Sequence, residues 1–298
     1  MLPVLFLAWL GRLRLVLQAS GAVALLVLAF QVSGNIGAHA TTVIEAVDPD
    51  RLRVCADANN LPFSNKAGEG FENKIAELLA EKLDRPLVYT WLPQIVGFVR
   101  KTLNAKKCDL IIGVNAGNEQ VLNTNPYYRT TYVLVYLKES GIKARSIADL
   151  KDYDVTIGTV GGTPPNLLLA EHGLLDRIYS YNLHYNTLVA TMGEIMIQDL
   201  KKGVTDVALM WGPIVGYHVR AQGVDAEVVP IQSTDRELGR MDYYISMGIR
   251  HGELDWKRKI NALIRKSRDE INAILLDYGV PLLNMRGKPT PLALNPDR

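Results

Sequence analysis

The sequence predicts an α/β protein built from two similar units, each with helices covering a mostly parallel sheet. Short apolar runs alternate with amphipathic segments from residue 52 to residue 114, which is the pattern of strands and helices in parallel sheets. A similar order of segments restarts near residue 132 and continues to residue 210. The chain has 298 residues, 48% of them hydrophobic, which is enough for one large domain or two modest ones.

The first unit begins with a short apolar run that ends in turn-forming residues, which predicts a buried strand. The clearest helix is Phe71–Leu83, where Ile75, Leu79 and Leu83 recur at helical spacing with charged residues between them. Asn, Pro and Ser dominate residues 59–64 and predict a loop. The remaining predicted elements are strands at Leu52–Asp57, Leu87–Leu92 and Asp109–Val114 and a helix over Phe98–Asn104.

The second unit repeats this order and leads into a long helical region. Strands are predicted at Tyr132–Leu137, Val155–Gly158, Ile178–Asn182, Asp206–Met210, Val228–Pro230 and Tyr244–Ile249. Helices are predicted at residues 166–172, Thr191–Lys202 and most of Leu254–Tyr278, and the proline-containing tail from Pro281 is expected to be irregular. Two such units suggest two lobes with a cleft, and the loops after the strands should face it because ligands bind beyond the carboxyl ends of strands.

The N-terminus has the order of a signal peptide. Arg12 and Arg14 precede an apolar stretch from Leu15 to Phe30, and Ala38-His39-Ala40 fits a cleavage site, which predicts a signal peptide at residues 1–40. The alternative is an uncleaved anchor helix. Either segment would deliver the rest of the chain outside the cytoplasm, and without residues 1–40 the formal charge falls from +2 to about 0.

Two cysteines, Cys55 and Cys108, lie in the part expected to be exported. A pair in an oxidising compartment suggests a disulfide, and the alternative is two buried, reduced thiols. The five histidines are far apart in sequence and no C-x-x-C motif occurs, so local spacing predicts no metal site, haem attachment or redox motif.

Several function classes are disfavoured by composition and motifs. There is no basic patch or long run of like charge of the kind that binds nucleic acid. The G-x-S-x-G, G-x-x-x-x-G-K, H-E-x-x-H and G-x-G-x-x-G motifs are absent. For a cleft enzyme, the nearby carboxylate candidates are Asp57 and Glu69, and Asp57 is more simply a turn residue at a strand end.

Residues 52–278 resemble the extracellular solute-binding family 3. The resemblance is carried, in this order, by the segments RVCADANNLPFS, GFENKIAELLAEKL, CDLIIGV, NPYYRTTYVLVY, VTIGTVGGTPP and DVALMWGP. CADANNLPFSN, GEGFENKIAELLA and PYYRTTYV further resemble its quinoprotein dehydrogenase-associated branch, which includes the J proteins of methanol dehydrogenase gene clusters. The resemblance implies a two-lobed periplasmic-binding fold of type II, with lobe 1 at 51–138 plus 245–298 and lobe 2 at 139–244. Two strands near Val135–Lys138 and Tyr243–Met247 would form the hinge.

The sequence departs from the amino-acid binders of this family at both ends of the ligand. Those proteins hold the α-carboxylate with an arginine in a T-x-x-R segment, but residues 116–122 contain no Arg or Lys. They hold the ammonium with a carboxylate after the DVALM-type strand, where this chain has Trp211. Burying two unpaired charges costs several kcal/mol each, so a free amino acid is not the expected ligand.

The remaining candidates for binding a ligand or partner are aromatic, amide or glycine residues on the loops expected to face the cleft. They are Asn59, Asn60, Phe63, Trp91, Tyr127, Tyr128, Arg129, Gly161, Gly162, Thr163 and Trp211. For each aromatic residue the alternative is core packing. Gly161-Gly162-Thr163 could hold an anion through backbone N–H groups at a helix start, or could simply be a glycine turn with Thr163 as the N-cap.

Taken together, the resemblance implies a periplasmic, non-enzymatic protein that assists the maturation or activation of a methanol (alcohol) dehydrogenase by protein contact. Pyrroloquinoline quinone (PQQ) and calcium or a lanthanide would belong to that partner enzyme, and no catalytic or metal-binding residue is expected in this chain. The alternative is the substrate-binding receptor of an ABC transporter for a small ligand other than an amino acid.

Overall fold

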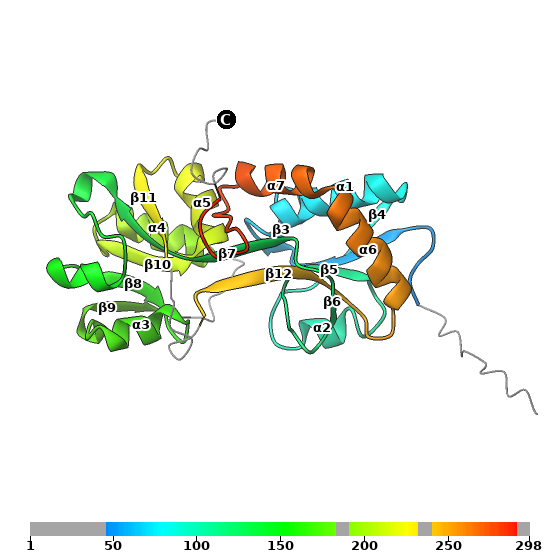
Figure 1. Ribbon diagram of the computed structural model, residues 1–298, viewed down its shortest axis with the longest axis horizontal. Helices are drawn as coiled ribbons and strands as arrows, with labels where there is room; N and C mark the ends of the chain where they lie inside the picture. The colour runs from blue at the N-terminus through cyan, green and yellow to red at the C-terminus, as the bar shows by residue number, and fades with distance from the viewer. Residues whose placement is uncertain (1–45, 183–190, 232–239, 291–298) are drawn as a thin grey trace, which may run out of the picture. The chain divides into compact units, whose positions relative to one another are not determined.

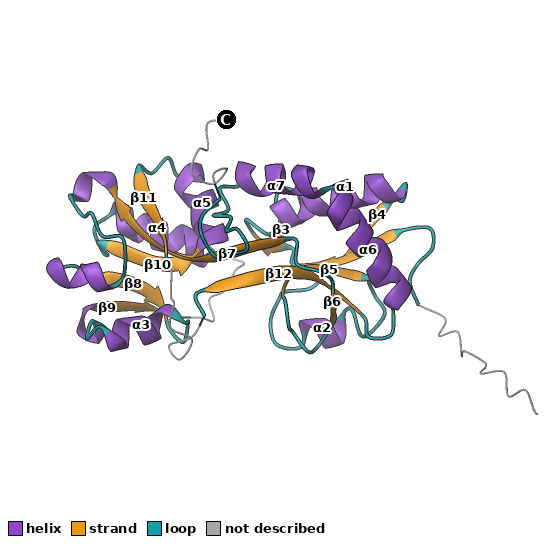
Figure 2. Cartoon of the chain, viewed as in Figure 1, coloured by secondary structure: helices purple, strands orange, loops and turns teal. Residues whose placement is uncertain are grey.

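The computed structural model describes residues 46–182, 191–231 and 240–290, which lie within one compact unit, Ile44–Arg298. The expected signal peptide, residues 1–40, lies outside the described residues. Within them the fold is the expected two-lobed α/β fold, in which helices cover the faces of a mixed sheet (Figures 1 and 2).

Within the described residues, ten strands form one continuous sheet with the main order β4-β1-β5-β12-β7-β10-β8-β9. Lobe 1 contributes β1 (Leu52–Ala56), β4 (Leu87–Trp91), β5 (Leu110–Asn115), β6 (Leu122–Asn123) and β12 (Asp242–Ile249). Lobe 2 contributes β8 (Ile157–Val160), β9 (Ile178–Tyr181), β10 (Val207–Trp211) and β11 (Ala226–Pro230). Pairing is parallel among β4, β1 and β5 and among β10, β8 and β9, and antiparallel around β12 and β7.

The strand β7 (Tyr128–Leu137) joins the two lobes. Its first residues, Tyr128–Thr131, pair with β12, and its later residues, from Tyr132 onward, pair with β10 and β11. The change of partner therefore falls between Thr131 and Tyr132, earlier in the chain than the hinge expected near Val135–Lys138, because Val135 is already inside the lobe 2 sheet. The numerical lobe boundaries remain a prediction.

Lobe 1 has its main core on one face of the sheet, under three helices: α1 (Phe71–Leu83), α6 (Leu254–Lys266) and α7 (Arg268–Asp277). Phe71, Ile75 and Leu79 on α1 are fully buried there, as their helical spacing predicts. On the other face, a smaller core surrounds the disulfide next to α2 (Phe98–Lys101). A short two-stranded sheet, β2 (Asn59–Asn60) with β3 (Ser64–Asn65), follows β1.

Lobe 2 has a core on each face of its sheet. The first lies under α3 (Pro165–Glu171) and two short 3-10 helices, Ala148–Asp152 and Leu175–Arg177. The second lies under α4 (Met192–Lys201) and α5 (Gly212–Ala221). A further 3-10 turn, Lys138–Ser140, follows β7.

The predicted helices and the longer strands agree with the structure to within a few residues. Among the described residues the structure adds the helix α5, the short strands β2, β3 and β6 and three 3-10 helices, and β2 and the start of β3 lie in residues 59–64, where a loop was expected. No helix was expected at residues 212–221, where Gly212, Pro213 and Gly216 lower the helix propensity. Pro213 is tolerated in the first turn of the helix, where backbone N–H groups lack intrahelical acceptors. Tertiary packing explains both glycines, because a Cβ on Gly212 would lie 2.6 Å from the Thr131 carbonyl oxygen and a Cβ on Gly216 would lie 2.0 Å from the Gly279 carbonyl oxygen.

Cys55 and Cys108 form the disulfide expected from their pairing, with Cα atoms 5.5 Å apart and 53 residues of sequence separation. Next to Cys108, the buried carboxylate of Asp109 accepts hydrogen bonds from Arg53 Nη2 at 2.7 Å and Arg250 Nη2 at 2.6 Å. Both guanidinium groups also donate to the carbonyl of Ala46. This network holds the start of the described chain against lobe 1.

Candidate binding site

The first candidate residues, Asn59 and Asn60, lie in the β2–β3 hairpin at the carboxyl end of β1. The Asn59 N–H donates to Asp57 Oδ1 at 3.0 Å, and the Gln94 N–H donates to Asp57 Oδ2 at 2.8 Å. Asn60 Nδ2 donates to Gln94 Oε1 at 3.3 Å. Asp57 therefore lies at the end of β1 and fixes the loops that contain Asn59 and Gln94. This agrees with the interpretation of Asp57 as a turn residue rather than a catalytic carboxylate.

Phe63 and Trp91 also lie near the ends of lobe 1 elements, and both are partly exposed. Phe63 packs edge-on against Phe71 with 5.3 Å between ring centroids, and Trp91 stacks on Tyr89 at 4.5 Å. Behind Trp91, the loop before α2 leaves the Val96 side chain 93% exposed. This end of lobe 1 therefore presents apolar surface to solvent.

The structure corrects the expectation that Tyr127 and Tyr128 line a cleft. Both rings are buried in the main core of lobe 1, and Tyr128 packs edge-on against Phe71. Hydrophobic burial therefore explains this pair of tyrosines without a ligand.

Arg129 is held by contacts within the chain. Its guanidinium forms an ion pair with Asp242, with Nη2 2.9 Å from Oδ1, and Nη1 donates to the carbonyl of Met285 at 2.7 Å. The same group lies over the ring of Tyr244. Arg129 thus ties β7 and β12 to the chain segment near Met285, and these contacts occupy the group that would otherwise hold a ligand carboxylate.

The Gly161–Thr163 segment forms a glycine turn, as its simpler interpretation predicted, but Thr163 does not cap α3. The N–H groups of Gly161 and Thr163 already donate to carbonyls of Tyr181 and Val160, so they are not directed at an anion. Thr163 is also not the N-cap, because α3 begins at Pro165 and the Thr163 hydroxyl donates to the Val160 carbonyl at 2.6 Å. Gly162 adopts a positive φ of 75° and allows the turn.

Trp211 lies at the end of β10 and immediately before α5. Its ring packs edge-on against Tyr132 at 5.1 Å and Tyr243 at 5.6 Å, next to the point where β7 passes from one lobe to the other. Where amino-acid binders of this fold are expected to place a carboxylate, this chain therefore has a cluster of three aromatic rings. Such a cluster offers no partner to a ligand ammonium group.

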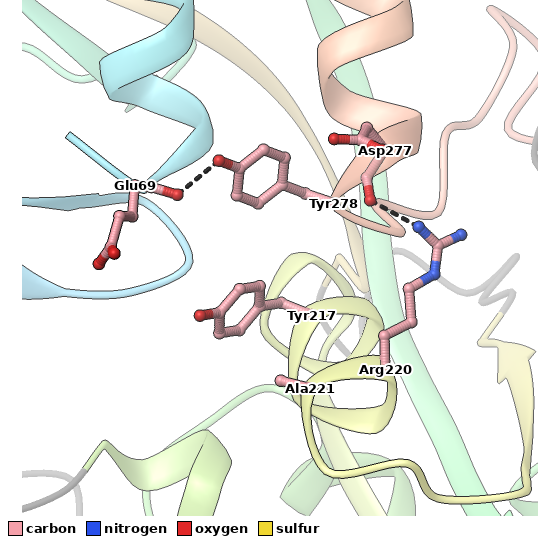
Figure 3. A pocket seen from close by; sticks show the side chains of 6 residues that line it. All are labelled: Glu69, Tyr217, Arg220, Ala221, Asp277 and Tyr278. Carbon is pink, nitrogen blue, oxygen red and sulfur yellow. Dashed lines mark hydrogen bonds between the residues drawn. The ribbon is translucent and has the colours of Figure 1, made fainter.

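A pocket of about 370 Å³ lies between α5 and lobe 1 (Figure 3). Its lining residues are Glu69, Tyr217, Arg220, Ala221, Asp277 and Tyr278. Only Glu69 was considered from the sequence, as a carboxylate near the first loop. No local pattern connects residues 217–221 with 277–278, because tertiary packing alone brings them together.

In the three described ranges, no group of three or more His, Cys, Asp or Glu side chains is placed to bind a metal ion. A search of the same residues finds no helix with the length and apolar character needed to cross a membrane. The described candidate residues carry aromatic, amide, carboxylate and guanidinium groups.

The chain belongs to the bacterial extracellular solute-binding proteins, family 3, whose family model matches residues 52–279. It is 32% identical to the protein MoxJ of Methylorubrum extorquens over 254 residues, covering 80% of this chain and 84% of MoxJ. The crystal structure of the periplasmic binding protein XoxJ from Methylobacterium extorquens AM1 is similar with 40% identity and a TM-score of 0.67, covering 78% of this chain and 99% of XoxJ. MxaJ from Methylophaga aminisulfidivorans is similar with 26% identity and a TM-score of 0.68, covering 78% of this chain and all of MxaJ. These similarities confirm the MxaJ/XoxJ-like branch.

Proposed function

We propose that this chain is a periplasmic, non-enzymatic accessory protein of a PQQ-dependent methanol (alcohol) dehydrogenase. It would act in maturation or activation of that enzyme by direct protein contact, after export by the N-terminal signal peptide. PQQ and calcium or a lanthanide would remain in the dehydrogenase. The observation that carries the proposal is the similarity to MoxJ and XoxJ over most of the chain.

The chemistry of the site supports an accessory function over amino-acid transport. Trp211 packs among aromatic rings where a carboxylate would be needed to bind an ammonium group. Arg129 is already paired with Asp242, so it does not offer a free guanidinium to an α-carboxylate. A buried zwitterion would lack partners at both charges, which is costly in a site shielded from water.

The test is recovery of the partner from the periplasm of methanol-grown cells. The full chain carrying a C-terminal affinity tag should copurify a quinoprotein dehydrogenase, identified by mass spectrometry, and cells lacking the chain should show reduced dehydrogenase activity. An exported amino-acid-binding protein with the same tag is the control. Absence of any quinoprotein in repeated purifications, together with normal dehydrogenase activity in the deletion strain, would contradict the proposal.

The second candidate function is the receptor of an ABC transporter for a small ligand other than an amino acid, and family membership favours it. A receptor should bind its ligand tightly, and ligand at 100 times Kd would raise stability by about 2.7 kcal/mol. Thermal shift measurements with organic acids, sugars and quinones separate the two functions. An unchanged Tm across these compounds would rule out the tested ligand classes.

A further inference from the structure

The pocket in Figure 3 is built by two segments from different lobes in close backbone contact. A Cβ atom added to Gly216 on α5 would lie 2.0 Å from the carbonyl oxygen of Gly279, so only glycine at position 216 allows this approach. The residues that follow Gly216 and precede Gly279 are Tyr217 and Tyr278. The contact therefore places these two tyrosine rings side by side, with 6.1 Å between centroids and 16° between planes.

Polar contacts fix the walls of the pocket. The Tyr278 hydroxyl donates to the carbonyl of Glu69, and Arg220 Nη1 donates to the carbonyls of Leu276 and Asp277. The Glu69 carboxylate accepts from Asn65 Nδ2 at 2.7 Å. Figure 3 shows both tyrosine hydroxyls on the side of the pocket where Glu69 lies.

The charges around the rings are predominantly acidic. Burial raises the pKa of Tyr217, and the carboxylates of Glu69 and Glu194 raise it further. The pKa of Tyr278 is likewise raised by burial and then by Asp277, Tyr217, Glu77 and Glu69. Of these carboxylates, Glu77 is paired with Lys74, whereas neither Glu69 nor Asp277 forms an ion pair within the described residues.

We propose that this pocket is a recognition site for the guanidinium group of an arginine side chain presented by another polypeptide. A cation in the pocket can lie within about 6 Å of both ring centres, the range in which aromatic faces attract cations. A guanidinium is planar, stacks on aromatic rings and can donate two hydrogen bonds to one carboxylate. Glu69 supplies that carboxylate. The positive charge of Arg220 opposes a cation, but the lining carboxylates of Glu69 and Asp277 outnumber it, and its guanidinium is directed at the Leu276 and Asp277 carbonyls.

An arginine within a polypeptide has no free α-ammonium or α-carboxylate, so its guanidinium is the charged group that meets Glu69 and Asp277. Four of the lining residues, Glu69, Arg220, Ala221 and Asp277, are exposed, so a protruding side chain can reach the rings. Because the walls come from both lobes, an occupied pocket would also hold α5 against lobe 1.

The site is tested on the purified protein alone, so its outcome is independent of whether a dehydrogenase is the partner. The probes are N-acetylarginine amide and N-acetyllysine amide, and their binding is measured by the NMR signals of the tyrosine rings at low salt. We expect N-acetylarginine amide to shift the signals of Tyr217 and Tyr278 with a Kd in the millimolar range, and N-acetyllysine amide to bind at least several-fold more weakly.

Matched variants separate recognition from a change of fold. Glu69→Gln and Tyr217→Leu should each weaken binding of N-acetylarginine amide by about tenfold, whereas Tyr217→Phe, which keeps the ring, should restore it. The controls are Glu139→Gln and Tyr179→Leu, two exposed residues outside the pocket, which should bind as the unchanged protein does. The proposal is overturned if the ring signals do not respond, if Glu69→Gln and Tyr217→Leu bind normally, or if N-acetyllysine amide binds equally well.

Discussion

Replacing one buried carboxylate, Glu72→Gln, should make the protein more stable at neutral pH. Glu72 lies in the first turn of α1 and is 5% exposed. A Cβ atom added to Gly113 on β5 would lie 1.8 Å from the Oε1 atom of Glu72. The Glu72 carboxyl group therefore lies directly against the backbone of β5. Burial raises its pKa to about 8, and the nearby Asp57 carboxylate adds to the shift.

The sign of the effect follows from linkage between protonation and folding. The folded state keeps Glu72 protonated up to a pKa of about 8, whereas the unfolded state releases the proton near the ordinary value of 4.5. The stabilisation is fully present below pH 4.5 and is lost as the pH rises toward 8. pH 7 lies about 2.5 pH units above the ordinary pKa of 4.5. At 1.36 kcal/mol per unit, the free energy of unfolding has therefore fallen by roughly 3 kcal/mol at pH 7.

Glutamine has the shape of the protonated acid and no charge, so the variant should not show this loss. Urea denaturation of both proteins from pH 5 to pH 8 measures the difference, which should grow from less than about 1 kcal/mol at pH 5 to about 3 kcal/mol at pH 7. Burial lowers the pKa of His218 to about 4, which makes the protein lose stability as the pH falls below the ordinary histidine value. This contribution is common to both proteins and cancels in their difference.

Glu77→Gln is the control, because Glu77 lies on the same helix with its side chain 49% exposed. It should leave the pH dependence of the free energy of unfolding unchanged. Equal pH slopes for the unchanged protein and Glu72→Gln would refute the reasoning. A variant whose loss of stability relative to the unchanged protein grows as the pH rises would mean that the carboxylate is the form that the folded state prefers.

Three further substitutions test the packing and the covalent link. Cys108→Ser removes the disulfide to Cys55 and should lower the free energy of unfolding by about 4 kcal/mol in the chain-entropy estimate for this loop, with no further effect of a reducing agent; an unchanged denaturation midpoint would contradict it. Gly216→Ala should destabilise the folded protein by about 1–3 kcal/mol, because the new Cβ atom meets the Gly279 backbone. Helix propensity alone favours alanine over glycine, so a higher Tm for this variant would refute the contact. Asp109→Asn leaves two arginine side chains without their shared carboxylate and should cost about 3–5 kcal/mol in urea denaturation, whereas Asp255→Asn, in an exposed pair, should cost less than about 1 kcal/mol.

Most elements of secondary structure could be predicted from the sequence, because each carries a local signal. The spacing of Ile75 and Leu79 repeats with the helical period, and Leu110–Val114 is apolar on both faces because helices cover both sides of the sheet. The disulfide could also be predicted, because two cysteines leave one possible pairing. The strand order could not be predicted, because it depends on which distant segments share apolar surface.

The candidate site was predicted only in part for the same reason. The sequence, through its resemblance to the amino-acid binders of the family, predicted that Trp211 stands where those proteins have a carboxylate, because that prediction concerns one position. Only the tertiary structure decided that Tyr127 and Tyr128 are core residues, that Thr163 does not cap α3 and that Arg129 is already paired. It also brought Tyr217 to Tyr278, because the approach of two backbones at glycines depends on the packing of whole helices and leaves no periodic pattern along the chain.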